Sequence, residues 1–219
     1  MIKEPLTDTQ AQAFTELMDM DKKYPVLVYC RQDGQMWPIA DVITGTDKMP
    51  DAGDTQKGLN RLLSLLADNE EYLLSPRRLM WVRRAIDLSL TAGADPMYVA
   101  PGSPDFTQSE SILTRFVMHK NYYGATAVLK SPKLTGEKQP TRLWRLLSRQ
   151  PLKPDMLGLC KALLKKKILP NRQYGIPPKI AIAIIRSDRL FFRQERIQLP
   201  VFLQRKAMIE GKHHERIRT

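Results

Sequence analysis

A chain of 219 residues with 42% hydrophobic and 26% charged residues has the composition of a folded protein with its own core, which excludes global disorder. Two cysteines are too few for a disulfide framework, and no apolar run is long enough for a membrane span or a secretory signal. We therefore expect a cytoplasmic protein, with secretion by a specialised system left open. The formal net charge of +12 suits polyanionic partners.

The positive charge lies in the second half of the chain. Residues 1–109 carry 11 Lys and Arg against 16 Asp and Glu, whereas residues 110–219 carry 24 against 7. A basic block of this size attracts nucleic acid, an anionic membrane surface or an acidic protein face. Charge alone does not choose among them, and the other interpretation is a solvated face on helices whose opposite side is core.

The chain begins with an amphipathic segment, 7–20, whose apolar residues recur at helical spacing. Two strand-like runs follow, 24–31 and 36–43, and the Asp-Gly pair between them predicts a β-hairpin. Because an isolated hairpin is marginally stable in water, this one must pack on helices or on a partner. The polar segment 44–58 is predicted to be a loop.

From residue 59 onward the pattern predicts pairs of helices, in the order 59–66 with 78–92, 110–119 with 122–130, 141–148 with 155–168, and 178–186 with 198–209. The clearest helix end is at Gly93, which adopts the left-handed C′ conformation without a Cβ penalty and is followed by Pro96. Stops recur at Ser131 and Leu169, each before a proline, 36 and 38 positions apart counting from Asp95. One helix pair per repeat of about 33 to 40 residues is typical of solenoids.

Two segments carry a resemblance to the ankyrin-repeat family. Residues 90–96, LTAGADP, resemble the L-x-x-G-A-D-x segment that ends a repeat, and residues 174–183, YGIPPKIAIA, are similar to the G-x-T-P-L-H-x-A segment that opens one. Pro177 stands where the family has Thr, and Lys179 and Ile180 stand where it has Leu-His. The other two candidate repeats lack the opening segment.

The resemblance covers roughly residues 55–207 and implies a mainly α fold, an ankyrin-like array of about four helix pairs over 55–209. Residues 1–54 would then be a helix and hairpin that cap the array or bind separately, and 210–219 a flexible basic tail. The other interpretation is an irregular helical domain with a single Gly-Ala-Asp turn.

Signatures of catalysis are missing from the sequence. We find no phosphate-binding loop, nucleophile elbow or zinc motif, and the three histidines, His119, His213 and His214, lack supporting ligands. We therefore expect no enzyme activity, no cofactor and no metal site. The ankyrin resemblance instead implies a protein-protein interaction module that binds an acidic partner protein, through the projecting loops 97–107, 133–139 and 172–176. The candidate contact residues are Tyr98, Phe106, Lys133, Lys138, Arg172 and Tyr174.

The alternative is a nucleic-acid-binding protein that uses the basic second half. Its candidate residues are Arg142, Arg145, Arg149, Lys165, Lys166, Lys167, Arg186, Arg189, Arg193 and Arg196. Aromatic residues lie among them and would suit base stacking, but we expect Trp144 in the core and leave Phe191 and Phe192 open. Cations near helix ends also complement the helix dipole, a purely structural role. A third possibility is a small bacterial, phage or plasmid effector that inhibits a host enzyme.

Overall fold

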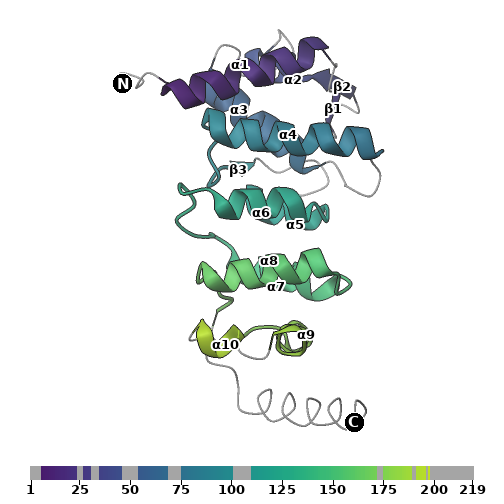
Figure 1. The fold of residues 1–219 in the computed structure, drawn as a ribbon, viewed down its shortest axis with the longest axis vertical. Helices are drawn as coiled ribbons and strands as arrows, with labels where there is room; N and C mark the ends of the chain where they lie inside the picture. Colours follow the sequence, from purple (N-terminus) through teal and green to yellow (C-terminus); the bar gives the residue numbers. More distant parts are fainter. Residues whose placement is uncertain are drawn as a thin grey trace. The chain divides into compact units, whose positions relative to one another are not determined.

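The computed structural model describes residues 6–23, 27–30, 35–45, 54–68, 75–100, 110–171, 175–188, 191–195 and 197. The described residues form ten helices and two pairs of short strands, so the predicted mainly α class is confirmed (Figure 1). The chain divides into two compact units, Met1–Glu137 and Lys138–Thr219. This boundary falls inside the segment 55–209. None of the described helices is long and apolar enough to cross a membrane.

Unit 1 opens with helix α1 (Asp8–Lys23), the antiparallel hairpin β1 (Leu27–Cys30) and β2 (Gln35–Pro38), and helix α2 (Ile39–Thr44). The predicted helix and hairpin are both present, with Cys30 paired to Gln35. The strand expected to run through 36–43 is wrong beyond Pro38. Proline has no N–H for a ladder and suits a helix start, and Ile39, Val42 and Ile43 are spaced so that one helical face buries all three.

The next helices of unit 1 are α3 (Thr55–Ala67) and α4 (Pro76–Ala92). Helix α3 begins one turn earlier than predicted, because the Asp54 carboxylate accepts hydrogen bonds from the backbone N–H groups of Gln56 and Lys57. The predicted end of α4 is confirmed. Gly93 has φ +116°, and the N–H of Ala94 donates to the carbonyl of Ser89. Helix α1 packs on α4, with Leu17 fully buried.

Beyond α4, the predicted loop 97–107 contains a short strand. Strands β3 (Val99–Ala100) and β4 (Glu110–Ser111) form a short antiparallel ladder before helices α5 (Ile112–Met118) and α6 (Tyr122–Lys130). Helix α5 begins two residues later than predicted because the Ser111 hydroxyl caps it, accepting from the Thr114 N–H. Within unit 1, α5 contacts α3 and α6 contacts α4, so the two helix pairs lie side by side (Figure 1).

Unit 2 contains α7 (Pro140–Arg149), α8 (Pro154–Lys165), α9 (Pro178–Ser187) and the short α10 (Phe191–Gln194). Each of the three longer helices begins at a proline, whose fixed φ suits the first helical position. Helix α8 ends at Lys165, before the predicted 168, because the chain turns into the left-handed region at Lys167, with φ +58°. Helix α10 was not predicted; the predicted helix 198–209 and the tail 210–219 lie outside the described residues.

The core of unit 2 contains the aromatic residues near the basic segment. Trp144 is fully buried, as predicted, and its indole N–H donates to the carbonyl of Ile168 at 2.8 Å. Phe191 and Phe192 are also buried and meet edge to face, with ring centroids 5.5 Å apart. These three rings therefore stabilise the packing of unit 2.

Candidate interaction surface

The boundary between the two units is also a boundary in charge. Residues 1–137 carry 15 Lys and Arg against 18 Asp and Glu, whereas 138–219 carry 20 against 5, so the formal net charges are −3 and +15. The basic block noticed in the sequence is thus a property of unit 2. Cations that share a surface in the described part of unit 2 are therefore the candidate contacts of a partner.

Helix α7 brings three of the predicted cations onto one face. Arg142, Arg145 and Arg149 are spaced by three and four residues, which places them on one side of an α-helix. Arg145 and Arg149 are exposed and Arg142 is half-buried. The opposite side of α7 is anchored in the core by Leu143, Trp144 and Leu147, all fully buried. We call the three arginines the α7 arginine face.

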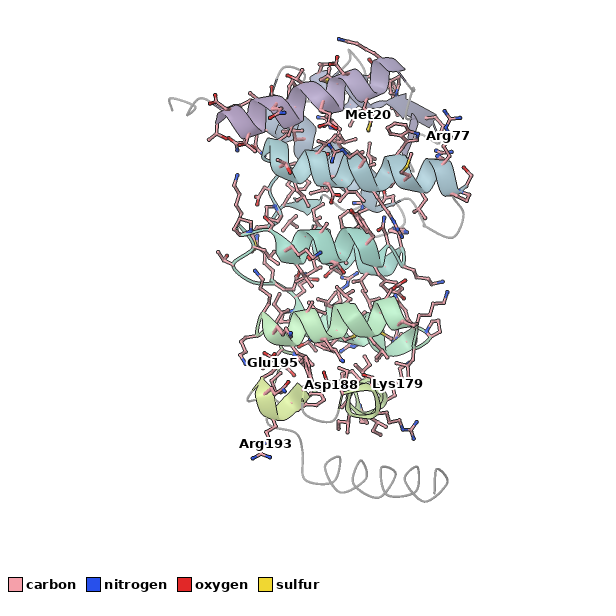
Figure 2. The ribbon with its side chains drawn as sticks, viewed as in Figure 1. Met20, Arg77, Lys179, Asp188, Arg193 and Glu195 are labelled. Atoms are coloured by element: carbon pink, nitrogen blue, oxygen red, sulfur yellow. The ribbon has the colours of Figure 1, made fainter. Side chains whose placement is uncertain are left out.

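The three predicted lysines at the end of α8 are also exposed, but Glu195, which follows α10, contacts two of them. The Lys165 ammonium lies 3.7 Å from a Glu195 carboxylate oxygen, and Lys167 donates to the Glu195 carbonyl at 2.6 Å. Earlier in α8, Lys161 lies 3.4 Å from the Asp188 carboxylate. Figure 2 shows Asp188 and Glu195 on the side of α9 and α10 that faces α8. These lysines therefore help to hold α9 and α10 on α8.

A further group of cations surrounds the turn between α7 and α8. The Lys179 ammonium, from α9, donates to the carbonyl of Gln150 at 3.0 Å, which brings α9 to this turn. Arg149 and Lys153 are exposed on either side of it, and between them Leu152 is 44% exposed. We call Arg149, Leu152, Lys153 and Lys179 the turn cluster. Leu152, Lys153 and Lys179 were not predicted as site residues. The sequence Pro-Leu-Lys-Pro, residues 151–154, could have indicated a turn at Leu152 and Lys153, because proline interrupts a helix.

The described part of unit 2 is poor in acidic residues. The described part of unit 2 contains three acidic residues, and two of them, Asp188 and Glu195, contact α8 lysines. The third, Asp155, lies in the first turn of α8, where it complements the helix dipole. The described part of unit 2, which contains the α7 arginine face and the turn cluster, therefore has a large excess of positive charge.

The other predicted residues that the structure describes belong to both units, and each is described within its own unit. Tyr98 is half-buried, and its backbone bonds to Asp95 and Ile112 at the base of the β3–β4 ladder. Lys133 is exposed in unit 1 and Lys138 in unit 2. Arg186 and Arg193 are exposed in unit 2, and Figure 2 shows Arg193 pointing away from α8. The remaining candidates lie outside the described residues: Phe106, Arg172, Tyr174, Arg189 and Arg196.

Unit 1 contains a buried charge cluster that the sequence did not predict. The Arg115 guanidinium donates to both carboxylate oxygens of Asp68, at 2.5 and 2.6 Å, and His119 Nε2 lies 3.4 Å from the same carboxylate. Burial alone would lower the pKa of Arg115, but the hydrogen bonds and charge of Asp68, helped by Glu110, raise it overall. The pair ties the end of α3 to α5, and we interpret it as structural.

The described residues offer little else for chemistry. No group of three His, Cys, Asp or Glu side chains within them could hold a metal ion. The thiol of Cys160 is buried, and burial raises its pKa to about 12, which makes it a poor nucleophile.

Comparison with known proteins shows no relative of this chain. The chain matches no protein-family model, and neither the curated proteins nor the solved structures contain a significant match to it.

Proposed function

We propose that this chain is a non-enzymatic protein-interaction module, built of ankyrin-like helix pairs, whose C-terminal unit binds an acidic partner protein. The observation that carries the proposal is the α7 arginine face. Three arginines share one side of a helix whose other side is locked in the core by Trp144 and two leucines. A partner therefore meets cations on a rigid scaffold, so that less conformational freedom is lost on binding.

Arginine suits this role for a chemical reason. Its planar guanidinium presents a fork of donors that matches a carboxylate in a bidentate geometry, and it is more weakly hydrated than an ammonium. The +15 charge of residues 138–219 also steers an acidic partner toward the unit. The described surface thus favours carboxylates carried by a protein with a complementary acidic face.

Nucleic acid is the second candidate, because the same charge attracts phosphates. The three aromatic residues that the structure describes in unit 2, Trp144, Phe191 and Phe192, are buried and are not available to stack on bases. The described surface therefore suits the phosphate backbone of a duplex better than unpaired bases. Such binding falls steeply with salt, by about a thousandfold or more between low and moderate salt for six to ten phosphate contacts.

The proposal is tested by capture of partners from the native host with nuclease-treated lysate, washed at two salt concentrations and identified by mass spectrometry. The native chain is compared with a triple variant of the arginine face, Arg142→Gln, Arg145→Gln and Arg149→Gln. The matched control removes the same charge from unit 1, with Lys22→Gln, Lys57→Gln and Lys130→Gln.

We expect one protein in stoichiometric amount with the native chain and the control, and its loss with the arginine variant. A partner that disappears with nuclease would indicate nucleic acid. A protein retained equally by the arginine variant would show that the surface lies elsewhere.

A further inference from the structure

We propose that the turn cluster selects an acidic protein segment that also carries an apolar side chain. The apolar group packs on Leu152, and flanking carboxylates pair with Arg149, Lys153 and Lys179. This inference rests on the proposed function and names the partner's chemistry at one end of the α7–α8 pair.

The turn is held in one shape before any partner binds. Pro151 and Pro154 fix their own φ angles and restrict the residues before them. Lys153 is extended, with φ −96° and ψ +154°; its N–H donates to the Pro151 carbonyl, and its own carbonyl accepts from the Leu157 N–H. Leu152 is therefore displayed on a braced segment, which limits the entropy lost when a partner covers it.

Cations surround this leucine on both sides of the turn. Arg149 ends α7, Lys153 precedes α8, and both are exposed. Lys179 uses one of its three ammonium hydrogens on the Gln150 carbonyl, which fixes its position and leaves donors for a carboxylate. Among the described residues of this turn and the first turn of α8, Asp155 is the one acid, so positive charge exceeds negative charge there.

The exposed leucine favours a protein segment over a phosphate backbone. Phosphates gain from the cations alone, whereas only a partner with an apolar group gains from covering Leu152. Because Leu152 is 44% exposed, covering what remains should tighten binding by about threefold to tenfold. An apolar centre with a charged rim is also the common arrangement of protein interfaces.

The probes are a fluorescently labelled Glu-rich peptide that contains leucines, the same peptide with serine at each leucine position, and a labelled DNA duplex. Their affinities are measured by fluorescence anisotropy on the full chain at one salt concentration. The test variant is Leu152→Ser. Leu169→Ser is the matched control, because Leu169 is 38% exposed and follows the lysines at the other end of the α7–α8 pair.

We expect the native chain and Leu169→Ser to bind the leucine-containing peptide about threefold to tenfold more tightly than the serine peptide. Leu152→Ser should bind both peptides equally, with the same affinity for the serine peptide as the native chain. Equal affinity of the native chain for the two peptides would overturn the inference while leaving the proposed function intact, as would loss of the preference in Leu169→Ser. Failure of both peptides to bind, or tighter binding of the duplex than of either peptide, would overturn the proposed function as well.

Discussion

Gly58→Ala tests how closely α2 and α3 pack in unit 1. A Cβ at Gly58 would lie 2.0 Å from the backbone oxygen of Ile43, where ordinary contacts begin at 3.4 Å. The obstacle is backbone, so α2 must move by about 1.4 Å and disturb Ile39 and Val42, both fully buried. Overpacking of this kind costs about 3 kcal/mol, and the better helix propensity of alanine offsets about 1 kcal/mol. We expect a net loss of about 2 kcal/mol in the free energy of unfolding.

Amide hydrogen exchange resolved by peptide measures this loss within one unit. Protection in α2 and α3 should fall by about 30-fold, since each 1.4 kcal/mol is a factor of ten, while α7 and α8 should be unchanged. The control is Gly158→Ala on the exposed side of α8, where an added Cβ has no neighbour within 4 Å. It should stabilise unit 2 by about 0.5 to 1 kcal/mol. Unchanged protection of α2 and α3 in Gly58→Ala would refute the close approach.

Three further predictions concern buried groups. Asp68→Asn leaves the Arg115 guanidinium without its counter-charge and should destabilise unit 1 by about 3 kcal/mol, measured by thermal unfolding; a loss below about 1 kcal/mol would indicate that the pair is effectively solvated. Trp144→Phe removes the donor to the Ile168 carbonyl and should cost unit 2 about 2 kcal/mol, and unchanged exchange protection in α7 and α8 would contradict that role. Burial raises the pKa of Cys160 to about 12, so about one thiol in ten thousand is a thiolate at pH 8. We therefore expect an alkylating reagent to modify Cys160 only in denaturant, as measured by mass spectrometry of peptides. Labelling of Cys160 in the native chain would disprove its burial.

The sequence predicted those helix ends and buried residues that neighbouring residues in the chain determine. Gly93 ends α4 because glycine tolerates φ +116°, and the apolar spacing around Trp144 placed that ring in the core. The helix 122–130 was predicted with the bounds that α6 has. In each case the deciding residues lie within one or two turns of the feature.

The predictions were wrong or incomplete where a short segment fits both a strand and a helix, or where contacts between distant residues determine the structure. Ile39, Val42 and Ile43 are β-branched and apolar, which suits a strand. Their spacing also fits one turn of helix, and packing against α3 selects the helix. The two-residue strands β3 and β4 are too short for any periodicity. Asp68 and Arg115 are 47 residues apart, so only the fold brings them together.

The candidate surface was predicted in part. Arg142, Arg145 and Arg149 were predicted as polyanion contacts, and the structure places them on one side of α7, opposite its buried face. Lys179 could not be added from sequence, because its place beside Gln150 depends on how α9 meets the α7–α8 turn. The lysines of α8 were predicted as ligand contacts, but two of them contact Glu195, which is 28 or more residues away.

The central claim is that unit 2 meets an acidic protein through α7 and the turn that follows. Hydrogen exchange of the chain with and without its captured partner, read peptide by peptide, tests this claim most directly. We predict slower exchange across residues 140–153 on binding and no change across α1 to α4. Protection confined to unit 1, with 140–153 exchanging as in the free chain, would contradict the account.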